Sequence, residues 1–166
     1  MNINNEPRIY IACLASYNNG IMHGKWIDAN QEESDLENEI SKILISSPID
    51  DAEEWAIHDY ECFGGIKISE WETMDTISNV ASGIDQHGEL FAEAYEYMGD
   101  IQDAKRMIED RFIGLYDSLI DYAEETIDLS EVPEYLQSYI NFNALARDME
   151  LDLIIFEVDN QLAIFH

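Results

Sequence analysis

The residues of this chain that are numerous enough, and suitably spaced, to form a functional site are its carboxylates. The sequence has 36 Asp and Glu against 8 Lys and Arg, a formal net charge of −28 over 166 residues. Carboxylates can transfer protons, hold divalent cations, or present negative charge to a basic partner. A small domain ordinarily carries a net charge of about 2–8, so the excess itself needs an explanation.

Enzymatic and metal chemistry find little support in the motifs. No acid pair can be selected for glycoside chemistry among so many, and the calcium-loop pattern is absent. His58 and Asp59 are adjacent on an expected strand and therefore face opposite sides, which makes His58 a structural histidine. Cys13 and Cys62 lack metal-site or disulfide spacing. We therefore expect no catalytic residue, cofactor or metal, and keep a carboxylate hydrolase or metal enzyme only as an alternative.

The acids have the spacing of helix faces. Residues three or four apart on a helix have Cβ atoms about 5–6 Å apart, comparable with phosphates along a DNA strand. One stripe is predicted on a helix over residues 85–97, and it would continue if the helix passed Gly99. A second is predicted on a long helix over residues 103–128, opposite an apolar face. The candidate partner-binding carboxylates are Glu89, Glu93, Glu96, Asp100 and Asp103 for the first stripe, and Asp110, Asp117, Asp121, Glu124 and Asp128 for the second.

Basic residues are missing from two long stretches that contain nine of these ten acids. Residues 68–104 contain nine acids and residues 112–146 contain seven, with no Lys or Arg in either stretch. Like charges at i, i+4 cost a helix roughly 0.2–0.5 kcal/mol per pair, a cost that folding does not require. The pattern predicts a charge-dependent interaction surface. Such a surface does not bind nucleic acid, which requires a basic patch, but it attracts a basic protein. At one charge per ~1.7 Å, its net charge matches about 14 base pairs of duplex.

The composition indicates a folded α+β chain and not a disordered acidic tail. Apolar residues make up 46% of the sequence and three Pro are present, whereas disordered segments lack such apolar content. Adaptation to high salt remains an alternative reason for the acidity. Strands are expected over residues 8–14, 23–29, 54–61, 151–158 and 161–165, with a hairpin turn at Asp159-Asn160 between the last two, and helices over residues 34–45, 69–82, 85–97, 103–128 and from 131 onward. Ser34 with Glu37 and Ser69 with Glu72 have the spacing of a capping box at two helix starts, and Gly83 and Gly99 are expected to break helices. Leu136, Ile140 and Leu145 mark the buried side of the segment after residue 131.

This order predicts three small units. They are an N-terminal sheet with a helix (residues 1–62), a central helical unit (63–103), and C-terminal helices with a small antiparallel sheet (104–166). The sequence has no run of 18 apolar residues, the length needed to span a membrane. Residues 1–8 do not resemble a signal peptide, so a cytoplasmic location is expected.

Several short sequence segments resemble those of the ArdA family of antirestriction proteins. They are IYIACL (9–14) followed by YNNG (17–20) and GKW (24–26), EWAIHDYE (54–61), YAEE (122–125), VPEYLQSYI (132–140) and ARDMEL (146–151). These segments occur in the family's order and cover most of the chain, so together they indicate the family more specifically than any one of them does.

The resemblance implies a non-enzymatic inhibitor, carried by mobile elements, that imitates B-form DNA. It implies an elongated fold of three units that forms a homodimer through its C-terminal part. The partner would be a type I restriction–modification enzyme, whose DNA-binding groove the inhibitor occupies competitively. The alternative is an acidic mimic directed at another basic DNA-binding protein, which the sequence does not separate from the first reading.

Overall fold

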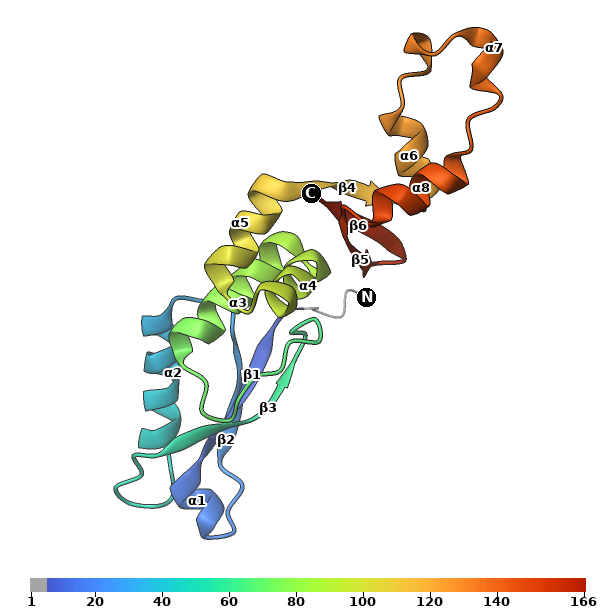
Figure 1. Ribbon diagram of the computed structural model, residues 1–166. Helices are drawn as coiled ribbons and strands as arrows, with labels where there is room; N and C mark the ends of the chain where they lie inside the picture. The colour runs from blue at the N-terminus through green and yellow to red at the C-terminus, as the bar shows by residue number, and fades with distance from the viewer. Residues whose placement is uncertain (1–5) are drawn as a thin grey trace, which may run out of the picture. The chain divides into compact units, whose positions relative to one another are not determined.

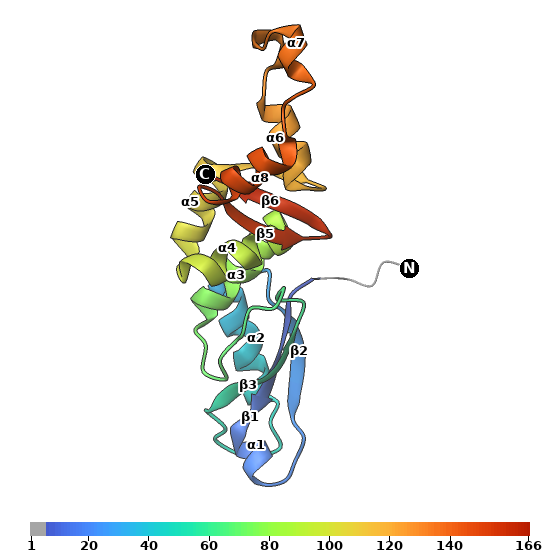
Figure 2. The same cartoon turned by 45° about the vertical axis from the view of Figure 1, so that its right-hand side comes forward.

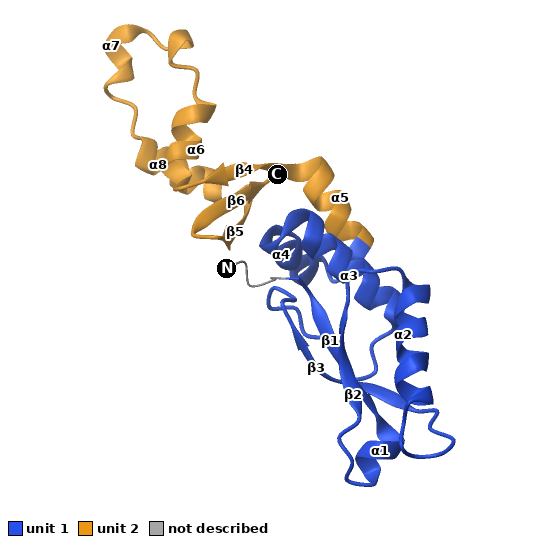
Figure 3. Cartoon of the chain, turned by 180° about the vertical axis from the view of Figure 1, so that it is seen from behind, with its two compact units in different colours: residues 1–101 blue, residues 102–166 orange. Residues whose placement is uncertain are grey.

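The computed structural model describes residues 6–166 and shows an α+β protein. Two antiparallel three-stranded sheets and eight α-helices are present in this range, in the order N-terminal sheet, central helices and C-terminal sheet (Figure 1). The predicted fold class is confirmed. The chain separates into two compact units, residues 1–101 and 102–166 (Figure 3). The division into three smaller units with boundaries near residues 62 and 103 stays a prediction.

The sheet of unit 1 follows the predicted strands. It contains β1 (Arg8–Cys13), β2 (Gly24–Asp28) and β3 (Trp55–Glu61) in the order β2-β1-β3. The helix α2 (Glu33–Ile45) contributes buried Leu36, Ile40 and Ile43 to the core of this unit. The turn expected after β1 contains a short helix, α1 (Leu14–Asn18), and Gly20 takes the positive φ of 74° that a turn glycine permits.

Two helix starts differ from the predicted capping boxes. The N-cap of α2 is Glu32, without a side-chain hydrogen bond, and not Ser34. The N-cap of helix α3 (Met74–His87) is Thr73, whose Oγ1 accepts the Thr76 N–H at 3.2 Å, and not Ser69. A hydroxyl three residues before a Glu was therefore insufficient to locate either helix start.

Gly83 does not interrupt α3, although the sequence predicted a break there. Its role is close packing, because a Cβ at this position would lie 2.5 Å from ring atoms of Phe91, which is fully buried. Phe91 belongs to the next helix, α4 (Glu89–Met98). The break falls at Gly88 (φ 60°), and Gly99 (φ 72°) ends α4 in the left-handed conformation as predicted.

Unit 2 contains β4 (Phe112–Tyr116), β5 (Ile154–Val158) and β6 (Gln161–Phe165), in the order β4-β6-β5. Its helices are α5 (Ile101–Arg111, whose first residue closes unit 1), α6 (Leu119–Thr126), α7 (Glu134–Gln137) and α8 (Phe142–Glu150), with a 3-10 turn at Leu129–Glu131. The β5–β6 hairpin turns at Asp159 and Asn160, both with positive φ, as the sequence predicted.

The long helix predicted over residues 103–128 is wrong. Phe112 pairs with Phe165 and Tyr116 with Leu162, so residues 112–116 form a strand between α5 and α6. The segment FIGLY is rich in aromatic and β-branched residues, which favour strands. Its apolar spacing also fits a helix, and only the partner strand about fifty residues later decides between the two.

The segment around α7 leaves its apolar side chains outside the core. Figures 1 and 2 show residues 127–141 extending from α6 and returning to α8. Leu136, expected to be buried, is 41% exposed, and Ile140 and Leu145 are only half-buried. No helix within residues 6–166 is long and apolar enough to cross a membrane.

Candidate partner-binding surface

The first acidic stripe lies on α4 of unit 1. The apolar side of this helix is buried through Phe91, Ala92 and Ala94. Glu89 and Glu96 are exposed on the other side and Glu93 is half-buried. Their i, i+4, i+7 positions place neighbouring Cβ atoms about 5–6 Å apart on one face. The structure therefore brings these three carboxylates together as the sequence predicted.

Asp100 and Asp103 do not extend this stripe on the same helix, because α4 ends at Gly99. Asp100 precedes α5, and Asp103 lies in the first turn of α5, where the helix dipole stabilises a negative charge. The Asp103 carboxylate also forms an ion pair with Arg106 at 3.2 Å.

The five acids of the second predicted stripe do not share a helix. Asp110 lies near the end of α5 and Asp117 follows β4, whereas α6 carries Asp121 and Glu124 and Asp128 caps the 3-10 turn. A stripe opposite Ile108 and Phe112 was expected, and it is wrong because β4 interrupts the helix. All five side chains are nevertheless exposed.

Three of these five acids accept local hydrogen bonds. Asp117 Oδ1 accepts from Gln161 Nε2 at 2.9 Å, and Asp121 Oδ2 accepts from Ser118 Oγ at 2.5 Å. Asp128 Oδ1 accepts from both the backbone N–H and the hydroxyl of Ser130. These bonds lower the pKa of Asp128, the hydroxyl bond contributing most. The carboxylates of Asp117, Asp121 and Asp128 therefore have structural roles that are independent of any partner.

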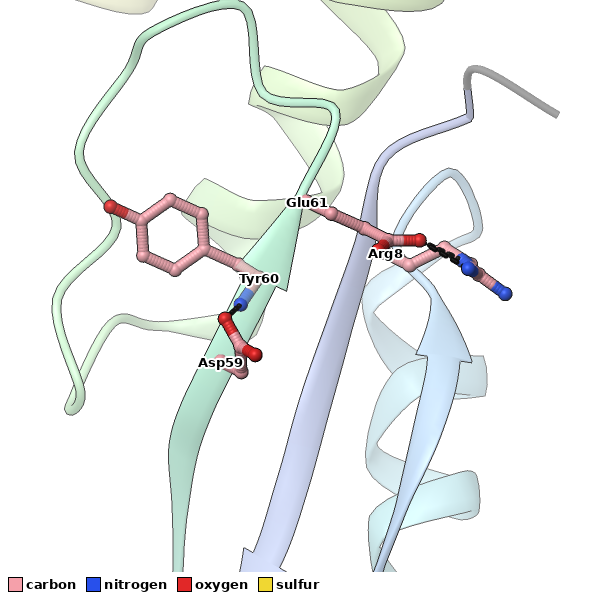
Figure 4. A network of polar contacts seen from close by, with 4 residues as sticks. All are labelled: Arg8, Asp59, Tyr60 and Glu61. Atoms are coloured by element: carbon pink, nitrogen blue, oxygen red, sulfur yellow. Dashed lines mark hydrogen bonds and ion pairs between the residues drawn. The ribbon is translucent and has the colours of Figure 1, made fainter. Parts of the chain in front are cut away.

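Few acids are neutralised by a base. Within residues 6–166, Lys and Arg form ion pairs at Arg8–Glu61, Lys25–Glu39 and Arg106–Asp103. Figure 4 shows the first of these, beside the Asp59 carboxylate that accepts the Tyr60 N–H at 2.8 Å. In that same part of the chain no ion pair involves Glu93, Glu96, Asp110 or Glu124. Their charge remains available to a basic partner.

His58 has structural contacts. Its Nε2 lies 3.8 Å from Glu70 Oε1, and its ring packs edge-on against Tyr17 with centroids 4.8 Å apart. Asp59 instead bonds the backbone beside it. In the described range, no group of three or more His, Cys, Asp or Glu side chains is arranged to hold a metal ion.

Sequence reasoning missed an apolar surface in unit 2. Tyr135 in α7 and Tyr139 just beyond it are 74% and 82% exposed. The signal was present in the segment YLQSYI (135–140), of which Leu136 and Ile140 were assigned to a buried helix side. A helix of four residues cannot bury such a face against the rest of the unit.

The fold and the exposed acids define a small, acidic α+β protein whose candidate site is a charged surface. The model of the family "Antirestriction protein (ArdA)" matches residues 9–162, so the chain belongs to the ArdA antirestriction family. ArdA antirestriction proteins are non-enzymatic inhibitors. No curated protein matches the chain.

Proposed function

We propose that this ArdA protein inhibits a type I restriction–modification enzyme by imitating B-form DNA. The observation that supports this most is the carboxylate stripe on α4, exposed at Glu89 and Glu96, in a folded protein that carries 28 more acids than bases. At the charge density of duplex DNA, that excess equals about 48 Å of helix axis.

The mechanism is competitive. Carboxylates replace DNA phosphates opposite Lys and Arg of the enzyme's groove, where charge-assisted hydrogen bonds are strongest. Association is accelerated by the complementary fields of the two proteins and weakened by salt. The partner is the DNA-binding methyltransferase part of the enzyme, and DNA is excluded while the inhibitor is bound.

A competition experiment tests this proposal. A fluorescent duplex carrying the recognition site is bound to a purified type I methyltransferase, and the ArdA protein is titrated in at several salt concentrations. We expect displacement of the duplex, with an inhibitor affinity that falls as salt rises. The double variant Glu93→Gln/Glu96→Gln should weaken displacement by a few-fold, while the single variants change it less, because the charge is distributed.

As a matched control, the double variant Glu150→Gln/Asp152→Asn removes two carboxylates that do not belong to the α4 stripe. The proposal fails if the wild-type protein does not displace DNA from any type I methyltransferase. Recovery of a different basic DNA-binding protein, bound competitively with DNA, would replace the type I enzyme as target while retaining the mimicry.

The exposed apolar side chains of unit 2 support a homodimer. Tyr135, Leu136 and Tyr139, in or just after α7, are all more than 40% exposed, and exposed apolar residues that lie together often mark a protein–protein contact. A second copy is the simplest partner of such a surface, since a two-fold interface places the same patch on both sides.

Sedimentation equilibrium tests the dimer. The wild-type chain should sediment as a dimer, and Tyr135→Glu with Tyr139→Glu as a monomer with an unchanged circular dichroism spectrum. Met22→Glu, an equally exposed apolar position in unit 1, should leave the dimer intact. A monomeric wild type, or a double variant that remains dimeric, would contradict this assignment.

A further inference from the structure

Unit 1 contains an open groove that differs chemically from the acidic stripe. It has a volume of about 840 Å³ and lies between one face of α2, the start of β3, and the segment that leads into α3. Buried Ile40 and Met74 and half-buried Leu44 form apolar parts of its lining.

Two tryptophans line this groove. Trp55 begins β3 and is half-buried, whereas Trp71 precedes α3 and is 64% exposed. Trp is enriched at protein interfaces, where its ring supplies a large apolar face and its N–H a hydrogen-bond donor. Trp71 also lies outside the helix that the sequence predicted for it, so amphipathic packing of α3 does not account for its position.

The rim of the groove is acidic. Five carboxylates line it and no Lys or Arg does; they are Glu33, Glu37, Glu53, Glu54 and Glu72. Glu72 Oε1 accepts the Thr73 N–H at 3.2 Å. Within the described residues, no ion pair involves the other four. The groove therefore combines indole faces, an apolar floor and uncompensated negative charge.

We propose that this groove docks an arginine-bearing segment of a protein partner. Guanidinium is planar, stacks on an indole face, and is less strongly hydrated than the ammonium of lysine. Its remaining N–H groups match carboxylates in bidentate geometry. The apolar floor accommodates the methylene stem of the same side chain.

This contact goes beyond the imitation of phosphates. A row of carboxylates binds both lysine and arginine through charge, whereas a groove with two indoles adds a stacking surface that favours arginine. The inference rests on the proposed function only in that the partner is the protein inhibited by this chain. The groove would then add a protein-specific contact to a charge-based interaction.

Calorimetric titration of the full chain with two peptides tests the inference. Hexa-arginine and hexa-lysine carry the same charge, so the ratio of their dissociation constants isolates the arginine preference. At physiological salt we expect wild type to bind hexa-arginine a few-fold more tightly than hexa-lysine, because the planar guanidinium stacks on an indole face and is less strongly hydrated than ammonium. Trp71→Ala should bring this ratio close to one.

A charge-matched pair of variants locates the binding. Glu33→Gln/Glu37→Gln should weaken binding of hexa-arginine more than Glu93→Gln/Glu96→Gln, which removes two charges from α4 of the same unit. A wild type without arginine preference, a preference that survives in Trp71→Ala, or equal effects of the two double variants would each overturn the inference.

The DNA competition experiment separates this failure from that of the proposed function. Displacement of DNA by wild type, together with no arginine preference, leaves DNA mimicry standing and removes the groove from it. An arginine preference without any displacement of DNA supports the groove and rejects the mimicry.

Discussion

The ten candidate carboxylates differ in what holds each one in place. Glu93, Glu96, Asp110 and Glu124 have no ion-pair partner within residues 6–166, whereas Asp128 is fixed by two hydrogen bonds from Ser130. A carboxylate fixed by its own chain has less freedom to follow a partner. The acids without local partners are therefore the better sites for testing charge-dependent binding.

Ser130→Ala should raise the pKa of Asp128 toward the ordinary value for aspartate. The hydroxyl hydrogen bond is the largest cause of the lowered pKa, and alanine removes it. A lowered folded-state pKa stabilises the fold above the unfolded-state value, and that stabilisation is lost as pH falls through the folded-state pKa. The variant should therefore show less of this acid-range dependence.

Carboxyl-carbon NMR shifts recorded against pH measure the Asp128 titration directly. Ser138→Ala, at the end of α7, should leave it unchanged. An identical Asp128 midpoint in wild type and Ser130→Ala would show that the hydroxyl does not set the pKa.

At the scale of elements, the sequence predicted the parts whose signal is local. The strands of unit 1 and the β5–β6 hairpin follow from alternating apolar residues and from Asp159-Asn160. The α4 stripe follows from helix spacing and the Gly99 stop. The second stripe does not, because residues 112–116 become a strand only by pairing with residues 162–165. The two strands are distant in sequence, so their pairing cannot be recognised from the apolar periodicity of residues 112–116.

The β5–β6 turn gives a prediction of stability. Asn160 has a φ of 64°, a conformation that costs most L-residues roughly 1–2 kcal/mol but suits Asn and Gly. Asn160→Ala should lower the free energy of unfolding by about 1 kcal/mol, while Asn160→Gly should not. Urea denaturation measures the difference.

Asn143→Ala, at an exposed position in α8, provides the control. Alanine is the better helix former, so this change should be neutral or stabilising. Equal losses at both positions would mean that the turn conformation is not the cause.

At the scale of the whole molecule, the same charge opposes folding and favours binding. Like charges repel one another in the compact state, and the Debye length falls from about 30 Å at 0.01 M salt to about 10 Å at 0.1 M. Added NaCl should therefore raise the melting temperature by several degrees, the shift that a gain of ~1 kcal/mol in the free energy of unfolding produces. The same addition should weaken displacement of DNA from the target.

Scanning calorimetry and the competition experiment, run over one series of NaCl concentrations, check the two opposite trends. A protein adapted to high salt would instead require molar salt to fold. A melting temperature that falls with added NaCl would contradict self-repulsion as the dominant effect.

The sheet of unit 2 has a consequence for how this protein must be handled. In the order β4-β6-β5, two of the three strands lie at an edge, and an edge strand presents unpaired backbone groups that can recruit another chain. At neutral pH, mutual repulsion keeps such edges apart. Near the isoelectric point of about 4.1 that repulsion vanishes, so acidification removes the barrier to strand-to-strand aggregation before it protonates every carboxylate.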